Sequence, residues 1–170
     1  MHLHEFERRV YEYQDRVFGF ACFFLGSRED ARDITQDVLI RFWNHREKID
    51  SDRLLPWLLR VTRNTCIDFK RHRKHTCEVN GQDSDRWEGT GQSPWEELER
   101  SETAQQIESA IERIPEPYRS VVILREIQHL KYDEISGAMD MPMNTVKVYL
   151  HRGRKILRDQ MSEVIDREHD

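Results

Sequence analysis

The chain has 170 residues, of which 37% are hydrophobic and 35% charged, and its formal net charge at pH 7 is −5. This composition is too apolar for a wholly disordered chain and suits one domain or two small helical ones. The longest apolar run, Phe18–Leu25, is too short to span a bilayer, and acidic residues near the start argue against a signal peptide. No direct membrane insertion is therefore expected.

The net charge conceals two basic segments. Residues 1–75 carry 15 Lys and Arg against 12 Asp and Glu, and residues 131–158 carry six against three. Between them, residues 76–100 carry two basic side chains against seven acidic ones. Each basic segment has a net charge of +3, and this asymmetry favours nucleic acid as a partner of both.

Two helices are predicted in the first 46 residues. An apolar series at helical spacing ends at Gly26-Ser27, where Ser27 can cap a second helix and Asp30 follows as in a capping box. The second helix spans about residues 28–46 and buries a stripe around Val38. Three polar side chains at i, i+3 and i+4 share another face, which is either solvated or a docking face for a basic partner: Asp33, Gln36 and Asp37.

A third helix is predicted to begin near Leu54, after the polar loop of residues 45–53. Its apolar stripe leaves a basic opposite side, which only Asp68 offsets, and this favours contact with phosphates. The side chains on that side are Arg60, Arg63, Asn64, Lys70, Arg71, Arg73 and Lys74.

The cysteines and the nearby histidines give no convincing metal site. Cys22, Cys66 and Cys77 are odd in number and scattered, which suits a reducing compartment better than a disulfide framework. A zinc site on His72, His75 and Cys77 would lack a fourth ligand at a usual spacing and would adjoin three basic residues. No metal or other cofactor is expected.

Periodicity stops near residue 76, and residues 76–94 form an acidic stretch rich in Gly, Ser and Asn that is expected to be a flexible linker. Trp87 and Trp95 are unusual in a pure tether and suggest that the linker docks onto a partner. Helices resume near Trp95, and Pro115-Glu116-Pro117 separates two of them. The chain is acidic from Asp159 onward, and this end, which includes the tail of residues 161–170, is expected to fray.

Residues 130–157 predict two short helices joined by a tight turn. Asp140 can adopt the left-handed conformation of such a turn, and Asn144 or Thr145 can cap the second helix. The second helix carries no acid between Asp140 and Asp159, and its basic residues favour a helix-turn-helix over a helical hairpin with a solvated charged face. These residues are Lys147, Arg152, Arg154, Lys155 and Arg158.

Three stretches in this order resemble the extracytoplasmic-function (ECF) RNA polymerase sigma factors. They are DARDITQDVLIRFW at residues 30–43, LPWLLRVTRNTCIDFKRHRK at residues 55–74, and IPEPYRSVVILREIQHLKYDEISGAMDMPMNTVKVYLHRGRKIL at residues 114–157. The resemblance implies an all-α protein of two small helical domains joined by the acidic linker. Residues 1–75 would form sigma domain two, and residues 95–160 sigma domain four with its helix-turn-helix.

The resemblance also implies roles for individual residues. Asp33, Gln36 and Asp37 would dock core RNA polymerase. The minus-ten promoter element would be engaged by the loop residues Lys48, Ile49, Asp50, Ser51, Asp52 and Arg53, and by Arg60, Arg63, Asn64, Lys70 and Arg71 of the third helix. The minus-thirty-five element would be engaged by Thr145, Lys147, Val148, Tyr149, His151, Arg152 and Arg154.

The implied partners are core RNA polymerase, promoter DNA and an anti-sigma factor that could hold the protein at the inner membrane face. The protein would be cytoplasmic, with no small-molecule substrate and no catalytic residue of its own. A stand-alone helix-turn-helix regulator is one alternative. An enzyme built on Asp30, Asp33 and Asp37 is another, but no convergent ligands from a second helix are evident.

Three positions depart from the family pattern. Asp140 replaces the usual turn glycine, and Val148 and Tyr149 replace small polar and basic residues, so the upstream sequence preference is expected to differ. Gly153 within the recognition helix costs about 1 kcal/mol relative to alanine, which suggests a close approach to the DNA backbone.

Overall fold

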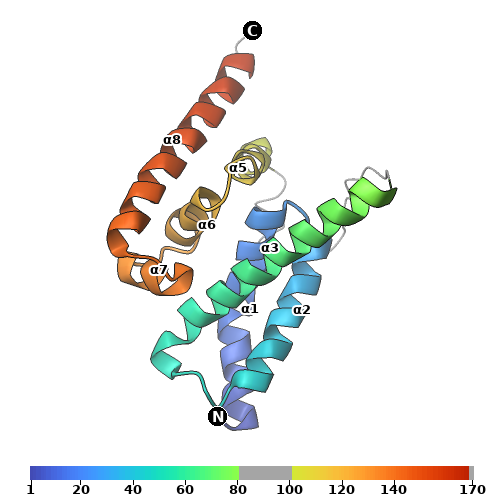
Figure 1. Ribbon diagram of the computed structural model, residues 1–170, viewed down its shortest axis with the longest axis vertical. Coiled ribbons are helices and arrows are strands. Elements are labelled where there is room, and N and C mark those ends of the chain that lie inside the picture. The colour runs from blue at the N-terminus through green and yellow to red at the C-terminus, as the bar shows by residue number, and fades with distance from the viewer. Residues whose placement is uncertain (81–100, 169–170) are drawn as a thin grey trace. The chain divides into compact units, whose positions relative to one another are not determined.

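The computed structural model describes the backbone of residues 1–80 and 101–168, and the side chains of residues 1–76 and 101–163. All regular structure in these ranges is helical (Figure 1), which confirms the predicted fold class. The chain divides into two compact units, Met1–Glu88 and Gly89–Asp170. No helix among the described residues is both long and apolar enough to cross a membrane.

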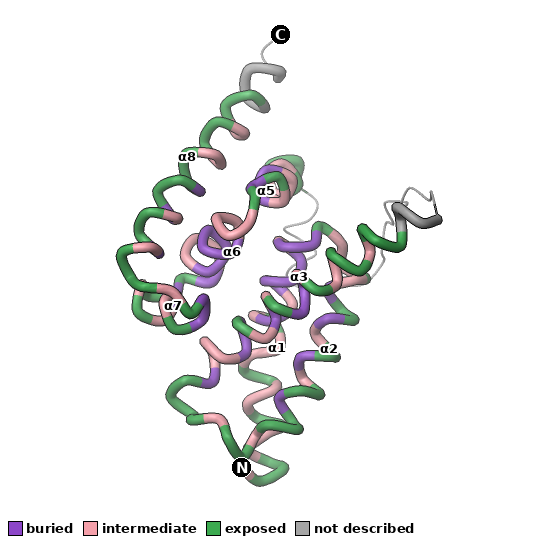
Figure 2. The backbone as a smooth tube through the Cα atoms, in the orientation of Figure 1, coloured by how far each residue is buried: buried purple, intermediate pink, exposed green. Residues whose placement is uncertain are grey.

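Unit 1 is a three-helix bundle. It contains α1 (Leu3–Leu25), α2 (Arg28–His45), a short 3-10 turn, η1 (Ser51–Arg53), and α3 (Leu54–Asn80), and each long helix packs against the other two. The buried positions lie along the inner sides of these helices (Figure 2). Burying each large apolar side chain contributes roughly 1.5–3 kcal/mol. The fully buried ones are Phe20, Phe24, Phe42, Leu54, Leu58 and Leu59.

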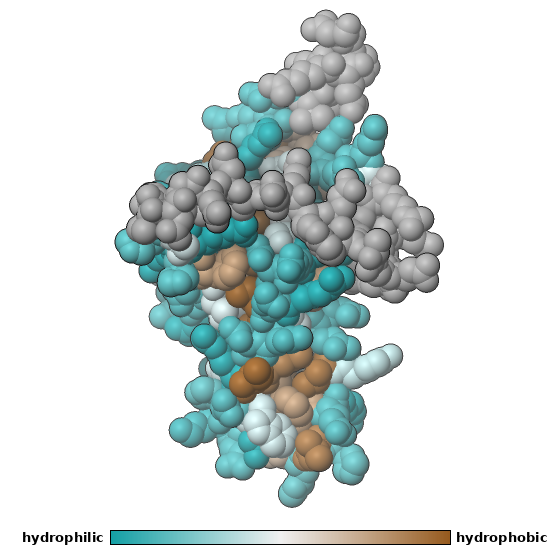
Figure 3. Space-filling view, turned by 90° about the vertical axis from the view of Figure 1, so that its right-hand side faces the viewer, coloured by the Kyte–Doolittle hydropathy of each residue, from teal (hydrophilic) through white to brown (hydrophobic). Residues whose placement is uncertain are grey.

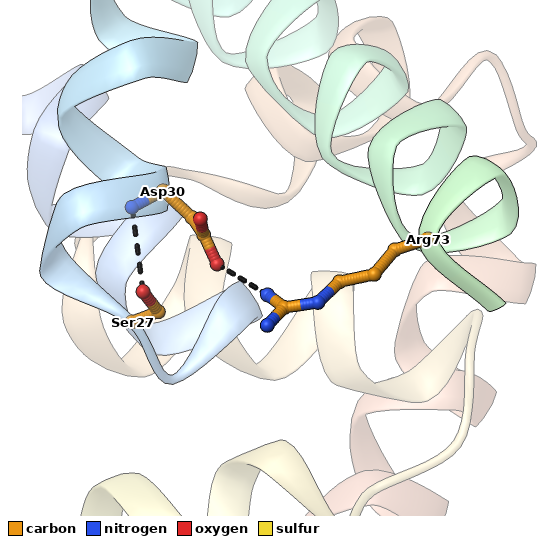
Figure 4. Close-up of polar contacts among 3 residues, drawn as sticks. All are labelled: Ser27, Asp30 and Arg73. Atoms are coloured by element: carbon orange, nitrogen blue, oxygen red, sulfur yellow. Dashed lines mark hydrogen bonds and ion pairs between the residues drawn. The ribbon is translucent and has the colours of Figure 1, made fainter. Parts of the chain in front are cut away.

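The α1–α2 junction forms at the predicted break. Gly26 adopts a left-handed conformation with φ of 68°, and its N–H donates to the carbonyl of Cys22. Ser27 caps α2, because its Oγ accepts a hydrogen bond from the Asp30 N–H at 3.3 Å. The Asp30 carboxylate accepts a hydrogen bond from Arg73 on α3 at 2.6 Å (Figure 4), which ties the start of α2 to the far part of α3.

Helix α3 extends beyond the predicted boundary at residue 75. It continues to Asn80, one residue before Gly81, which is the first glycine after Gly26. Polar composition alone does not end a helix. Residues 81–94 of the predicted linker lie outside the described residues, as do Trp87 and Trp95.

Unit 2 is built around one long helix. It contains α5 (Glu102–Glu112), α6 (Tyr118–Val122), a π-helical segment, η2 (Ile123–Ile127), α7 (Tyr132–Met139) and α8 (Met143–Glu168). Helix α8 packs against α5, α6 and α7. The fully buried large side chains of this unit are Ile111, Ile114, Ile123, Leu124, Leu130 and Ile135.

The connection between α5 and α6 is held by two side chains. The Glu116 carboxylate accepts hydrogen bonds from the Ser120 N–H and hydroxyl at 2.6–2.8 Å. Arg119 Nε donates to the Ile114 carbonyl at 2.8 Å. Burial lowers the pKa of Arg119 from its ordinary value, while the neighbouring charge of Glu116 raises it.

The helix-turn-helix forms as predicted, with two differences. Asp140 occupies the left-handed conformation at φ 53° and ψ 50°. Helix α8 already begins at Met143, so Asn144 and Thr145 lie within its first turn and their prediction as caps is wrong. At its other end α8 continues to Glu168 and does not fray from Asp159 onward as expected.

Gly153 allows two helices of unit 2 to pack closely and does not face DNA. A Cβ atom added there would lie 2.5 Å from Val122 Cγ2 and 3.3 Å from the Tyr118 carbonyl oxygen. Real Cβ atoms do not approach so closely, so the missing side chain is what allows α8 to lie against α6. The prediction that Gly153 faces the DNA backbone is therefore wrong.

Candidate polymerase and nucleic-acid interfaces

The outer face of α2 combines acidic and apolar side chains. Asp33, Gln36 and Asp37 are all exposed, as predicted, and lie opposite the buried stripe of α2. Ile40 is 59% exposed and follows Gln36 by one helical turn. This face therefore offers negative charge at one end and apolar surface at the other, an arrangement that complements a basic partner with apolar contacts of its own.

Trp43 is fixed at the apolar end of α2. The Phe6 ring of α1 meets it edge-on with ring centroids 4.8 Å apart, and the Arg46 guanidinium carbon lies 3.8 Å from its centroid. Trp43 nevertheless stays 36% exposed. In the space-filling view, apolar side chains gather on the lower part of the visible face of unit 1 (Figure 3).

The loop after α2 exposes most of its predicted site residues. Lys48, Asp50, Ser51, Asp52 and Arg53 are exposed, and Ile49 is half-buried. Asp50 has a local structural role, because its Oδ1 accepts a hydrogen bond from the Asp52 N–H at 3.2 Å. This bond caps η1 and sets the direction in which the chain enters α3.

Helix α3 presents the predicted basic surface. Arg60, Asn64 and Arg71 are exposed, while Arg63 and Lys70 are half-buried. A shallow hollow on this helix is lined by Arg63, Asn64, Ile67, Asp68 and Arg71. The ammonium of Lys70 lies over the ring of the buried Phe24, 5.6 Å from its centroid, so this half-buried side chain packs against the core of unit 1.

Arg73 differs from its neighbours on α3. The sequence groups it with the phosphate-binding residues, but its guanidinium is engaged by the Asp30 carboxylate (Figure 4). This pair also weakens the alternative of an enzyme built on Asp30, Asp33 and Asp37, because one of the three carboxylates is already bound. Among the described residues, no group of three or more His, Cys, Asp or Glu side chains could hold a metal ion, and the Cys77 side chain lies outside those residues.

The orientation of α8 is fixed by Gly153. At about 100° per residue, the side chains opposite Gly153 form one outward row, and all of them are exposed. This row consists of Asn144, Lys147, Val148, His151, Lys155 and Arg158. Three of these were predicted as site residues. Asn144, Lys155 and Arg158 were not, although they have the same helical phase as Lys147 and His151.

The other predicted residues of α8 lie on its flanks or face inward. Thr145 is half-buried, and the Tyr149 ring packs edge-on against Tyr118 with centroids 5.2 Å apart. Arg152 is exposed, but its Nη1 lies 3.2 Å from the Tyr118 hydroxyl. Arg152 therefore lies beside the outward row, and its role at the minus-thirty-five element stays a prediction.

Arg154 flanks Gly153 on the opposite side from Arg152. Its Nε donates to Glu126 Oε1 at 2.6 Å, and its Nη2 lies 2.5 Å from the same oxygen. Gly153 thus meets α6 between two arginines, each held by a residue of α6 or η2. Helical phase places Arg152 outside the outward row, but Arg154 follows Lys147 by seven residues and has nearly the same phase. Its partner Glu126, which only the folded unit brings close, distinguishes Arg154 from that row.

The chain matches both parts of one protein family. Sigma-70 region 2 matches residues 10–76, and Sigma-70 region 4 matches residues 104–157. The ECF RNA polymerase sigma factor SigW of Bacillus subtilis is 30% identical over 161 residues, which cover 89% of this chain and 86% of that protein. The chain belongs to the ECF sigma factor family. This confirms the resemblance seen in the sequence.

The ECF sigma factor SigE of Mycolicibacterium smegmatis is also 30% identical over 155 residues, and the chain spans 60% of the length of that relative. Two solved structures share the fold at lower identity. The sigma factor RpoE, solved with the anti-sigma factor NepR from Bartonella quintana, has a TM-score of 0.78 and 18% identity over 93% of this chain and 97% of that one. CnrH, solved with the cytosolic domain of CnrY, has a TM-score of 0.73 and 19% identity. The match covers 95% of this chain and 90% of CnrH.

Family membership assigns this chain to the proteins that direct promoter-specific initiation of transcription by RNA polymerase. The stand-alone regulator is not favoured, because a helix-turn-helix regulator has no need of Sigma-70 region 2, which matches α1 from residue 10 onward, α2 and most of α3.

Proposed function

We propose that this ECF sigma factor uses three separate surfaces: the outer face of α2 for core RNA polymerase, the loop and basic side of α3 for the minus-ten element, and the outward row of α8 for the minus-thirty-five element. The observation that carries this proposal is that most residues of each set are exposed on α2, on α3 with its preceding loop, or on α8. Chemistry would belong to the polymerase, so the chain itself is not an enzyme.

The docking surface on α2 centres on Asp33, Gln36 and Asp37, with Ile40 extending it. Exposed acids beside an exposed isoleucine suit a basic helical surface on the polymerase. Charge complementarity would steer the encounter, and the apolar contact would slow dissociation.

The minus-ten surface combines the loop of residues 48–53 with Arg60, Arg63, Asn64, Lys70 and Arg71. Exposed basic residues along several turns of one helix give contacts to phosphates, which position DNA without reading its sequence. The adjoining loop would bind the separated strand, because its exposed polar side chains suit hydrogen bonding to an unpaired base.

The minus-thirty-five surface is the outward row of α8. Lys147, Val148 and His151 lie in its N-terminal half, the part of a recognition helix that contacts base edges. Lysine suits guanine, and the exposed valine suits the methyl group of thymine. Lys155 and Arg158 lie further along the helix, where phosphate contacts are expected.

An anti-sigma factor is a further expected partner. The RpoE structure with this fold was obtained with such an inhibitor, and CnrH was solved with the cytosolic domain of CnrY. In this chain, an inhibitor that covered the α2 face or the outward row of α8 would block polymerase or promoter binding. Because its partners are polymerase and promoter DNA, the protein would act in the cytoplasm, and a membrane-bound inhibitor would hold it at the inner face.

Transcription in vitro with purified core polymerase over a genomic promoter library tests the proposal. The chain should produce transcripts from a defined set of promoters that core polymerase alone does not use. Tight, specific duplex binding by the chain without polymerase, together with no new transcripts, would instead identify a stand-alone regulator.

A further inference from the structure

The ion pair between Glu126 and Arg154 lies at the edge of the proposed DNA-binding helix. Glu126 belongs to η2 and Arg154 to α8, and they meet beside the contact of Gly153 with Val122. Arg154 lies about 100° around α8 from Gly153 and precedes Lys155 of the outward row. Its charge is therefore adjacent to the DNA-facing side but is turned toward Glu126.

The pair is poorly suited to a purely structural role. The side chains of Arg154 and Glu126 are 45% and 38% exposed. Ion pairs so open to solvent contribute little to folding stability, because water screens them and the long side chains lose rotamer freedom. Either side chain of such a pair can also exchange its partner for another charged group without any opening of the core.

The geometry leaves part of the guanidinium available. Glu126 Oε1 is contacted by Nε and by Nη2. A DNA phosphate approaching along the flank of α8 would compete with Glu126 for the same cation, since arginine binds carboxylate and phosphate in similar ways. Recognition helices are bordered by phosphates on both sides of the major groove.

We infer that Glu126 is a positioning residue that withholds Arg154 from DNA phosphates and thereby limits binding that does not depend on sequence. Phosphate contacts strengthen binding to every duplex equally. Without this one, the base contacts on the outward row supply a larger share of the total binding free energy. This inference rests on the proposed role of α8 as the minus-thirty-five surface.

The test uses the full chain assembled with core polymerase and measures binding to two duplexes over a range of salt concentrations. One duplex carries the selected upstream element, and the other has that element scrambled. Glu126→Gln should steepen the slope of log K against log salt by up to about 0.9. It should also strengthen binding to the scrambled and the selected duplex by a similar factor, because a phosphate contact does not depend on sequence. Glu126→Asp, which keeps the charge, should stay close to the wild-type slope.

The Arg154→Ala background shows whether the effect passes through Arg154. There, Glu126→Gln should add nothing to the slope. An unchanged slope for Glu126→Gln in a folded protein, or the same increase without Arg154, would overturn the inference. Thermal unfolding of each variant identifies any change of slope caused by misfolding.

Lys155→Ala separates this inference from the proposed function. If α8 binds DNA, Lys155→Ala flattens the salt slope whatever Glu126 does. If Lys155→Ala leaves the slope unchanged, the proposed DNA surface is wrong and the role of Glu126 falls with it. If Lys155→Ala flattens the salt slope but Glu126→Gln leaves it unchanged, the inference about Glu126 is wrong and the proposed function stands.

Discussion

Arg71 and Arg73 lie two residues apart on α3 but have different surroundings. Arg73 donates to Asp30 at 2.6 Å, whereas Arg71 is exposed and lines the hollow beside Asn64. On α8, Arg152 and Arg154 are likewise engaged by Tyr118 and Glu126. Side-chain partners thus divide these residues into Arg71, which is exposed on α3, and the arginines that contact a neighbouring element, which are Arg73, Arg152 and Arg154.

Arg73→Ala is expected to destabilise unit 1 by about 1 kcal/mol, because it removes a partly buried charged hydrogen bond. Arg71→Ala is the matched control and should leave the stability within about 0.5 kcal/mol while weakening promoter binding. Denaturant unfolding and promoter binding at several salt concentrations would check both. Equal destabilisation in the two variants would contradict the division.

Lys147→Ala is expected to relax the preference at one upstream base pair by about 1–3 kcal/mol, since a lysine at the N-terminal half of a recognition helix can reach a guanine edge. Lys155→Ala should weaken all upstream sequences alike. Transcription from matched promoter variants measures both effects. If Lys147→Ala reduced every variant by the same factor, Lys147 would be a phosphate contact instead.

At the scale of elements, periodicity and breakers predicted most of the helices. The α1–α2 break at Gly26 and the left-handed turn at Asp140 followed from residue chemistry, because few residue types suit those conformations. The π-helical segment did not, since its Gln128 N–H to Ile123 carbonyl bond leaves no clear trace in the sequence pattern. The role of Gly153 was also mistaken, because its neighbour Val122 is 31 positions away in the chain.

Gly153→Val should destabilise unit 2 by about 2 kcal/mol or more, because its Cβ would overlap Val122. Gly137→Ala in α7 is the matched control, since nothing lies within 4 Å of a Cβ there. The control should stabilise by about 0.5–1 kcal/mol through helix propensity. Thermal unfolding distinguishes the two variants. In a Gly153→Val protein, the second change Val122→Ala should restore part of the lost stability, because it removes the atom that the new Cβ would overlap.

Asp37→Arg should weaken binding to core polymerase at least about tenfold, because like charges at a complementary interface cost several kcal/mol. Asp15→Arg, an exposed reversal on α1, is the control for net charge. Co-purification with core polymerase and helicity by circular dichroism would measure the result. Wild-type recovery of the folded Asp37→Arg protein would contradict a docking role for this face.

At the scale of the whole molecule, an acidic protein carries basic surfaces on both of its units. The segment charges predicted this from the sequence, and the family match confirmed the two-part organisation. Which side chains face outward could be predicted from helical phase on α2. On α8 the phase follows from its buried stripe, which includes Val146 and Leu150. The partners of Arg152 and Arg154 could not be predicted, because Tyr118 and Glu126 are distant from them in sequence.

Changing Arg60 and Arg71 together to alanine should lower promoter opening for all sequences. It should also flatten the salt dependence by up to about 0.9 for each duplex phosphate that the variant no longer binds. The outward row of α8 is untouched, so the order of preference among upstream elements should be kept. Open-complex yields on matched promoters would show this. A changed order of preference would mean that α3 also reads the upstream sequence.

The close packing at Gly153 has a consequence for how this protein can diverge. Residues that hold α8 against α6 and the residues proposed to contact DNA occupy opposite sides of one helix, and no position in the outward row contributes to the core. Promoter preference can therefore change through single substitutions at positions such as Val148 and His151, with no compensating substitution in the core. Duplicated copies of such a gene could acquire separate sets of target promoters while inheriting an unaltered scaffold.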